Sequence, residues 1–396
     1  MRHSCIQMLF LSLILSALCC ETAQAASRKD RAVRDSLWNV AIEHSQHGRF
    51  EESNAVFQDL IDNYGLSLRR KKEAWWRIGR MARLSGDYRS FCKYESLRGA
   101  RIHNFFLALA ELPPRCMERH GHDVSVDYIV DSVFVDGEYR GGLIKIPVTV
   151  NGHQEWFIID NGMEEYNLVS ESFAARCGIR SIGVGASLSG STGSKTSYNM
   201  GVLDSLSIGS LTFRNLLFSI VPDSSIENPF MDLSAMLGSG FFRLAGEMLF
   251  LNKERKIVFP ERQEELESNL TLNGVDEHLV QVGVFGDTLR FQLDLGSART
   301  HMNGYYFERN KEWIQDTFPT DTTTTYGLGG AKQERFYVVD SLLFTACGGV
   351  FRKEKVRIET SKVDIFTDYD GLLGSDFLLF FDKAALNLRN MYLYVE

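Results

Sequence analysis

The stretches FIIDNGMEEYNLVS (157–170) and FQLDLGSARTHMNG (291–304) follow the same pattern, and this pattern decides the fold. Each stretch runs apolar residues into an aspartate, Asp160 or Asp294, and has a glycine two positions later. A buried strand that ends in an aspartate and a glycine turn can present a carboxylate at a cleft. Two copies of this unit therefore predict a pair of carboxylates.

The sequence around the two stretches is duplicated. A single Asp-x-Gly triplet is a weak signal, because a chain with 33 Gly contains it by chance about once or twice. Three landmarks, however, recur in the same order at nearly one offset: Asp160 and Asp294 at 134 residues, VLDSLSI (202–208) and VVDSLLF (338–344) at 136, and AMLGSGFF (235–242) and GLLGSDFL (371–378) at 136. Agreement of three landmarks indicates an internal repeat.

The composition is that of an ordinary globular protein. The chain has 396 residues, 44% of them hydrophobic and 24% charged, which is long enough for two or three domains with sizeable cores. A formal net charge of −8 argues against nucleic acid or an anionic membrane as the main partner.

Residues 1–25 have the features of a signal peptide. Arg2 provides a basic start, LFLSLILSAL (9–18) is an apolar run, and AQA (23–25) is a small-x-small cleavage site. The run is shorter than the roughly 20 residues that span a bilayer, and no transmembrane segment is expected. We expect an exported protein that is periplasmic, at the cell surface or secreted.

The mature chain would keep Cys92, Cys116, Cys177 and Cys347. Four cysteines in so long a chain are not a disulfide framework, and no two of them have zinc-ligand spacing. A local bridge between Cys92 and Cys116 and a set of four unpaired thiols both fit the sequence.

The segment 26–112 is predicted to be helical. Within it, LWNVAIEHSQHGRFEESNAVFQDLI (37–61) and AWWRIGRMARLSGDYRSFCKYESL (74–97) match at an offset of 38, with a Gly-x-aromatic turn in each. The two segments resemble degenerate tetratricopeptide (TPR) helix hairpins, which have a small residue where the two helices cross and a turn of this kind between them. Such a region can bind a protein partner or simply cap its neighbour, and the sequence leaves both open.

The composition changes after Pro113. Residues 113–123 are predicted to be a linker, and short β-branched and aromatic runs broken by Gly, Asn and Asp follow to the end of the chain. The repeat divides this mainly β region into 124–262 and 263–396. One short helix, SESFAARCG (170–178), is expected after the first aspartate.

The repeated unit resembles the retropepsin-like aspartic peptidases, in which an apolar strand leads into Asp-Thr/Ser-Gly. Two fused copies resemble a bilobal, pepsin-like module of β-barrel lobes. The resemblance implies catalytic roles for Asp160 and Asp294. The other residues that it implies are the turn residues Asn161, Gly162, Leu295, Gly296 and Ser297, the supporting glycines Gly238 and Gly374, and the flap-tip residues Tyr326, Gly327, Gly329 and Gly330 of YGLGG. A first-lobe flap is expected within 183–198.

This chain departs from the family pattern beside each aspartate. The family has Thr or Ser there, whose hydroxyl ties the two catalytic loops together, and this chain has Asn161 and Leu295. Asn can donate and accept hydrogen bonds and Leu can do neither, and an unsatisfied buried partner costs about 1–3 kcal/mol. After the turn glycines come Met163 and Ser297, of which only Ser297 could bond the outer oxygen of its aspartate.

Two functions are compatible with these residues. The resemblance implies an aspartic-type endopeptidase, a hydrolase whose two aspartates share a proton and activate water against an extended peptide substrate, without a cofactor. The alternative is a catalytically silent peptide- or protein-binding module on the same scaffold. Retention of Asp160 and Asp294 favours the enzyme, whereas Asn161 and Leu295 favour the silent module.

Other catalytic motifs are absent from the sequence. It contains no H-E-x-x-H, G-x-S-x-G or C-x-x-C, which removes the common metalloprotease, serine-hydrolase and redox alternatives. His120 and His122 are more simply explained as part of a linker than as metal ligands, so no metal site is predicted.

Overall fold

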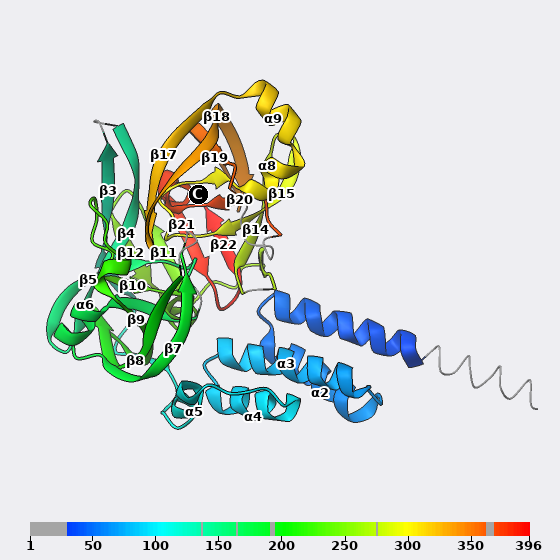
Figure 1. The fold of residues 1–396 in the computed structure, drawn as a ribbon. Coiled ribbons are helices and arrows are strands. Elements are labelled where there is room, and N and C mark those ends of the chain that lie inside the picture. The colour runs from blue at the N-terminus through cyan, green and yellow to red at the C-terminus, as the bar shows by residue number, and fades with distance from the viewer. Residues whose placement is uncertain (1–29, 136–137, 164, 191–194, 275, 362–367) are drawn as a thin grey trace, which may run out of the picture.

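The fold comes from a computed structural model that describes residues 30–396 except 136–137, 164, 191–194, 275 and 362–367. The predicted signal peptide lies outside the described residues. The chain is mainly β, with a helical region at its N-terminal side (Figure 1). In the part of the chain that the structure describes, no helix is both long enough and apolar enough to cross a membrane.

The helical region consists of successive antiparallel helices. Its helices are residues 30–46, α2 (Phe50–Asn63), α3 (Leu68–Leu84), α4 (Tyr88–Arg98) and α5 (Asn104–Ala110). Gly48 and Gly86 have φ angles of +72° and +79°, and they make the two turns that the offset of 38 predicts. The core of the region is apolar and includes Trp38, Ala41, Phe57, Leu60, Ala74 and Ile78.

The first β sheet follows the helices. Its hydrogen-bonded order is β1-β9-β6-β10-β5-β4-β8-β7, and β3 also pairs with β4. The strands are β1 (Cys116–Arg119), β3 (Ile129–Val135), β4 (Glu138–Val150), β5 (His153–Ile159), β6 (Asn167–Ser170), β7 (Arg180–Ser189), β8 (Lys195–Ile208), β9 (Leu211–Val221) and β10 (Ala235–Leu237). β1 lies within the segment predicted as a linker, where it pairs with β9.

A second sheet forms from the rest of the chain, in the order β13-β14-β15-β20-β16-β19-β18-β17. Its strands are β13 (Leu270–Leu272), β14 (His278–Val284), β15 (Asp287–Leu293), β16 (His301–Met302), β17 (Thr320–Gly327), β18 (Gly330–Ala346), β19 (Gly349–Glu359) and β20 (Gly371–Leu373). We call residues 116–259 the first half and residues 270–395 the second half.

A third sheet joins the two halves. Its order is β2-β12-β11-β21-β22, and β11 of the first half pairs antiparallel with β21 of the second. These strands are β2 (Val124–Asp127), β11 (Glu247–Leu251), β12 (Lys256–Phe259), β21 (Lys383–Asn387) and β22 (Tyr392–Val395). One hydrophobic cluster runs through both halves and this sheet, so that the halves share a core.

The strand pairings of the first sheet recur in the second. β5 pairs parallel with β10, where Ile159 lies opposite Leu237, and β15 pairs parallel with β20, where Leu293 lies opposite Leu373. β7 and β8 form one hairpin, and β17 and β18 form the other. The structure therefore repeats at nearly the same offset as the sequence.

Short helices complete both halves. They are α6 (Glu171–Arg176), the 3-10 turn η1 (Asp223–Ser225), α7 (Ser239–Ala245), α8 (Gly304–Arg309), α9 (Lys311–Thr317) and α10 (Ser375–Phe380). α6 is the helix predicted after the first aspartate, and Gly178 follows it with a φ of +66°. α7 to α10 were not predicted from the sequence.

Candidate active site

Two equivalent strands deliver the aspartates. β5 and β15 share a burial pattern in which the first residues are exposed and the last three are buried. The chain then turns, and the backbone N–H of Asp160 donates to Leu237 O at 2.9 Å while that of Asp294 donates to Leu373 O at 3.0 Å. Each aspartate is therefore fixed at the end of a buried strand, as the sequence pattern predicts.

The two turns interlock through their glycines. A methyl group added to Gly162 would overlap the carboxylate of Asp294, and one added to Gly296 would overlap that of Asp160. Only glycine allows the two turns to approach so closely. This reciprocal packing brings the two carboxylates together from the two halves.

The carboxylates are paired and partly shielded from solvent. Asp160 Oδ1 accepts from the backbone N–H of Gly162 at 3.0 Å, Asp294 Oδ1 accepts from that of Gly296 at 2.9 Å, and the two carboxyl groups hydrogen-bond each other. Burial, and then the charge of Asp294, raises the pKa of Asp160 well above its usual value. Burial also raises the pKa of Asp294, although the hydrogen bond from Asp160 opposes it. Two buried carboxyl groups this close cannot both ionise easily, and such a pair can share one proton.

Asn161 links the first turn to the second. Its Nδ2 donates to Leu293 O at 2.7 Å, and its Oδ1 accepts from Leu295 N–H at 2.8 Å. These bonds hold the backbone on both sides of Asp294. An amide therefore makes the two-way connection across the halves for which the related peptidases use a hydroxyl.

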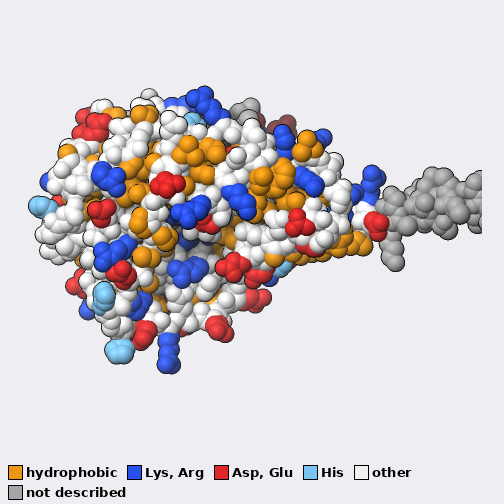
Figure 2. Space-filling model, turned by 90° about the horizontal axis from the view of Figure 1, so that it is seen from below, with side chains coloured by type: hydrophobic (Ala, Val, Ile, Leu, Met, Phe, Trp, Pro, Cys, Tyr) orange, Lys and Arg blue, Asp and Glu red, His pale blue; other side chains and the backbone are white. Residues whose placement is uncertain are grey.

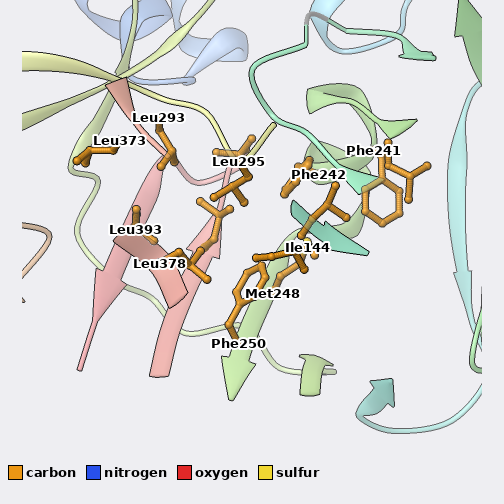
Figure 3. Close-up of a cluster of buried hydrophobic side chains, with 14 of the residues drawn as sticks. Ile144, Phe241, Phe242, Met248, Phe250, Leu293, Leu295, Leu373, Leu378 and Leu393 are labelled. Carbon is orange, nitrogen blue, oxygen red and sulfur yellow. The ribbon is translucent and has the colours of Figure 1, made fainter. Parts of the chain in front are cut away.

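The Leu295 side chain cannot make the corresponding hydrogen bonds from the second turn to the first. Its side chain is fully buried in the shared core, among Ile144, Met248, Phe250 and Leu378 (Figure 3). The second turn is therefore anchored by apolar packing at the position where the first turn has hydrogen bonds. Burying a residue of this size contributes roughly 1.5–3 kcal/mol.

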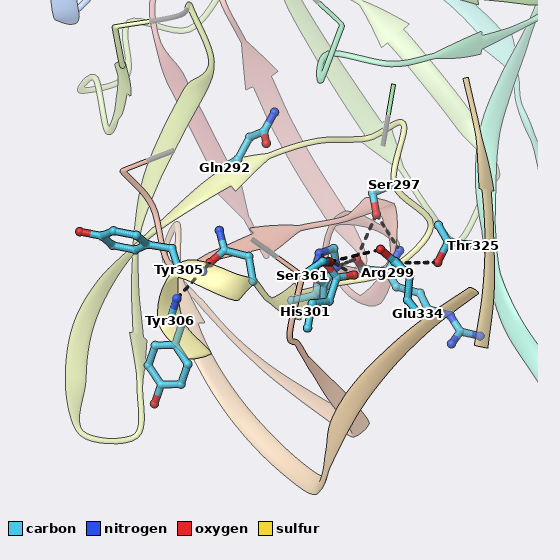
Figure 4. Close-up of polar contacts among 12 residues, drawn as sticks. Gln292, Ser297, Arg299, His301, Tyr305, Tyr306, Thr325, Glu334 and Ser361 are labelled. Atoms are coloured by element: carbon cyan, nitrogen blue, oxygen red, sulfur yellow. Dashed lines mark hydrogen bonds and ion pairs between the residues drawn. The ribbon is translucent and has the colours of Figure 1, made fainter. Parts of the chain in front are cut away.

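The Ser297 hydroxyl does not bond its aspartate. Its Oγ donates to Arg299 O at 3.1 Å and accepts from Arg299 N–H at 3.5 Å (Figure 4). The hydrogen bond that Ser297 could make to the outer oxygen of Asp294 is replaced by this local pair of bonds. A serine hydroxyl readily closes such a local turn onto the backbone two residues on.

The segments that begin at Gly238 and Gly374 lie behind the turns. Gly238 N–H donates to Asn167 Oδ1 at 2.9 Å, and Gly374 N–H donates to Thr300 Oγ1 at 3.1 Å. A methyl group on Gly374 would lie 2.8 Å from Ser297 O, which is too close for any larger residue. Each of these segments is therefore tied to a residue of its own half.

The predicted flap tip, residues 326–330, is the turn of the β17–β18 hairpin. Gly327 pairs with Gly330 at the end of the two strands. Gly329 N–H donates to Ser225 O of the first half at 2.7 Å. The hairpin therefore reaches across to the other half.

The hairpin of β7 and β8 meets this tip. It covers the segment expected to form the first-lobe flap, apart from the residues that the structure does not describe, and a methyl group on Gly190 would overlap Leu328. Tyr326 also makes an edge-on ring contact with Phe230 at 5.4 Å between centroids. One hydrophobic cluster is contacted by side chains from both aspartate turns and from both hairpins. These side chains are Met163 and Ala298 of the turns and Leu188 and Leu328 of the hairpins.

Polar side chains of the second half lie near the β17–β18 hairpin. Glu334 of β18 accepts hydrogen bonds from Thr325 at 3.0 Å and Ser361 at 3.2 Å (Figure 4). His301 lies 3.4 Å from Glu359. Among the described residues, no group of His, Cys, Asp and Glu side chains is arranged to hold a metal ion, and Cys92, Cys116, Cys177 and Cys347 are free thiols.

Sequence reasoning missed Glu165. It follows Asp160 by five residues, is 2% exposed, and contacts Tyr88 of the helical region and Arg115. Its partners lie 77 and 50 residues away in the sequence, and no motif connects them. A lone glutamate in a polar turn otherwise indicates a solvated position.

Two buried carboxyl groups, each at the end of one of two equivalent strands, form the candidate active site. A family model described as aspartyl protease matches residues 146–240, the part of the chain that carries Asp160 and Gly238. The match supports an aspartic protease family and an aspartic-peptidase-like function for that part. No curated protein sequence matches the chain.

Two solved structures are similar to the chain. Basic 7S globulin from soybean has 10% identity and a TM-score of 0.41, over 69% of this chain and 94% of its own. A retropepsin-like aspartic protease from Rickettsia conorii has 14% identity and a TM-score of 0.24, over 37% of this chain and 95% of its own. Both likenesses are too weak to bear on the fold or the function.

Proposed function

We propose that the chain is an aspartic-type endopeptidase that hydrolyses peptide bonds in extended substrates. The observation that supports this most is the reciprocal packing of Gly162 on Asp294 and of Gly296 on Asp160. Such packing has a use when two carboxylates must share a proton, and it is costly otherwise, because two buried acids repel each other when both ionise.

In the proposed reaction the two carboxyl groups act together. The ionised carboxylate takes a proton from a water molecule while the neutral carboxyl donates a hydrogen bond to the peptide carbonyl oxygen. The water oxygen bonds to the carbonyl carbon while the carbonyl oxygen takes the proton of the neutral carboxyl, which gives a tetrahedral intermediate. As its C–N bond breaks, the amine nitrogen takes the proton that came from water, and a hydroxyl proton of the intermediate returns to the other carboxylate. The dyad titrates as a unit, so neither Asp160 nor Asp294 is assigned as the base.

We also propose that the two halves are the two lobes of an aspartic-protease module, with β7–β8 and β17–β18 as flaps. The repeated strand pairings and the shared β11–β21 sheet support this proposal. An extended peptide would lie between the aspartates and the hairpins and pair with their backbones as a strand does. The contact between Gly190 and Leu328 would have to open for the peptide to enter.

The test is cleavage of a mixed peptide library across pH 3–7 by the wild type and by Asp294→Asn. We expect cleavage by the wild type that Asp294→Asn abolishes. Absence of cleavage at every pH, or equal cleavage by the variant, would overturn the proposal.

A second candidate function is a silent peptide- or protein-binding module. The burial of Leu295 in place of a hydroxyl favours it, because one of the two ties between the catalytic loops is missing. This function predicts peptide capture that survives Asp160→Asn and Asp294→Asn. Loss of capture in both variants would contradict it.

The helical region and the N-terminus complete the proposal. We propose that the helical region is TPR-like and can dock a protein partner, since its turns at Gly48 and Gly86 recur 38 residues apart.

We also propose that the chain is exported, with residues 1–25 removed. Mass spectrometry of the N-terminus of the protein recovered from an expressing cell tests export, and retention of residues 1–25 would contradict it.

A further inference from the structure

The loop that follows Asp160 is held by residues outside the first half. Glu165 Oε1 accepts hydrogen bonds from the hydroxyl of Tyr88 and from Arg115 Nη2 at 3.0 Å. Glu165 Oε2 lies 3.8 Å from Arg83 Nε. Arg83 is in the last turn of α3 and Tyr88 begins α4, so the α3–α4 hairpin ends on this loop.

Glu165 is buried and closely packed. Its residue is 2% exposed, and a methyl group added to Gly240 would overlap its backbone carbonyl. A methyl group on Gly86, in the turn between α3 and α4, would lie 2.6 Å from the guanidinium of Arg115. A displacement of this hairpin would therefore displace the loop.

In the second half, an acid of the same half supports the equivalent loop. Asp376 of α10 accepts hydrogen bonds from Thr300 N–H at 2.8 Å and from Thr300 Oγ1 at 2.7 Å, and it pairs with Lys353. The repeat aligns Asp376 with Gly240. The first half therefore lacks the internal acid, and the helical contacts of Glu165 lie where that support is missing.

Helix α3 also contacts the second half. Arg80 Nε donates to Asp276 Oδ1 at 2.6 Å, Arg80 Nη2 donates to Asn273 O at 2.8 Å, and Arg83 Nη2 donates to Asp276 Oδ2 at 3.1 Å. Viewed from the side of the helical region, Lys and Arg side chains lie among hydrophobic ones across the surface (Figure 2). α3 is thus fixed to both halves by arginines, and this attachment defines where the hairpin sits relative to the two turns.

We propose that the helical region is a built-in support of the active site, which holds the Asp160 turn against the Asp294 turn through Glu165. Glu165 and Tyr88 are then positioning residues, not catalytic ones. The catalytic part of this inference rests on the proposed peptidase function. Its structural part, a turn held by the helices, does not.

The experiment compares Tyr88→Phe with Tyr94→Phe in the full-length protein. Both tyrosines lie on α4, but the Tyr94 hydroxyl donates to Gln58 at 3.4 Å within the helical region and does not touch Glu165. Hydrogen–deuterium exchange of peptides spanning 157–170 reports on the turn, and kcat and KM on a cleaved peptide report on catalysis. Glu165→Gln and Glu165→Ala provide a second pair, since Gln still accepts the Tyr88 hydrogen bond.

We expect Tyr88→Phe to speed exchange in 157–170 and to lower kcat about tenfold with KM nearly unchanged, because a misplaced turn weakens only the chemical step. Tyr94→Phe should leave both measurements at the wild-type values, and Glu165→Gln should keep more activity than Glu165→Ala. Equal exchange in Tyr88→Phe and Tyr94→Phe would overturn the proposal. If the wild type cleaves no peptide, the proposed function fails, and the exchange comparison still decides whether the helices hold the turn.

Discussion

The loop that follows Asp160 is supported by the helical region, whereas the loop that follows Asp294 is supported by an acid of its own half and by Asn161 of the first half. Glu165 of the first loop contacts the helical region, and Asn161 reaches the backbone of the second half. The second loop instead contacts Asp376 of its own half, and its Leu295 is buried in the shared core.

This difference shows which parts of the duplicated unit the geometry demands. Both turns keep the aspartate, the close glycine and the hydrogen bond to the neighbouring strand, because each of these places a carboxylate atom directly. The side-chain contacts that hold each turn can differ, because any contact that fixes the backbone of the turn also fixes its aspartate. The predictions that follow attack first the shared elements and then those that differ.

The largest effect is expected at the aspartates themselves. Asp160→Asn and Asp294→Asn should each lower kcat/KM by about 10³-fold or more, because an amide cannot share the proton that the pair needs. The two losses should be similar although the turns are supported differently. Initial rates on the best peptide from the library measure this, and circular dichroism confirms that each variant is folded. A variant that keeps most of its activity would break the equivalence of the two turns.

The next effect concerns the interlocking glycines. Gly162→Ala and Gly296→Ala should each lower kcat/KM by about 100-fold and destabilise the fold by about 1–3 kcal/mol, because the new methyl group overlaps the opposite carboxylate. Gly274→Ala is the matched control, since nothing lies within 4 Å of its added methyl group. Chemical denaturation and initial rates measure both effects. Wild-type behaviour of either variant would show that the turns are not interlocked.

Asn161 gives the sharpest contrast between the turns. Asn161→Ala leaves Leu293 O and Leu295 N–H without their partner, at about 1–3 kcal/mol each, and should lower kcat roughly tenfold. Asn161→Thr should retain more of the stability and more of the kcat, since a hydroxyl can also accept from one group and donate to the other. Denaturation midpoints and kcat measure the difference. Equal losses in the two variants would argue against the hydrogen bonds as the cause.

The complementary change, Leu295→Thr, restores the family residue to the second turn. We expect it to destabilise the protein by about 1–3 kcal/mol, because the hydroxyl enters a core of Leu, Met and Phe side chains (Figure 3). The measurement is urea denaturation at pH 7, with Leu295→Val as the control for lost volume. A Thr variant as stable as the Val variant would mean that the hydroxyl finds a partner and that the second turn can be tied in the same way as the first.

The sequence predicts the turns well because their pattern is local. An apolar strand, an aspartate and a glycine lie within six residues, and the burial of Phe157 to Ile159 follows directly from that order. For Asn161 the sequence indicates only a side chain that can donate and accept hydrogen bonds, and its partners Leu293 O and Leu295 N–H come from the structure. Leu295 is buried, as its side chain alone would suggest.

The supports of the turns could not be predicted in the same way. The contact between Glu165 and Tyr88 depends on where the helical region docks, and that follows from the whole surface of two regions. The direction of the Ser297 hydroxyl depends on the local backbone of its loop, where a serine can bond its own chain as easily as an aspartate. Side-chain partners across regions need the folded structure.

The smallest effect is a gain in stability. The folded protein raises the pKa values of Asp160 and Asp294, so it binds their proton more tightly than the unfolded chain does. The stability from this proton is fully present below the ordinary carboxyl pKa, near 3.9, and is lost as the pH rises through the raised values. Asp294→Asn removes one of the two ionisable groups and with it part of this loss of stability, so the variant should unfold at a higher temperature than the wild type at pH 7.

The same reasoning predicts that this gain disappears in acid. At about pH 3 both wild-type carboxyls are protonated, no repulsion remains, and the two proteins should unfold at the same temperature. Thermal unfolding followed by circular dichroism between pH 3 and pH 7 measures the difference, with Asp382→Asn on the exposed surface as the control. Asp160→Asn should follow the same curve, because both turns contribute to one pair. A gain that is independent of pH, or seen in only one of the two variants, would mean that the carboxylates titrate separately and that the two turns differ at the site itself, not only in their supports.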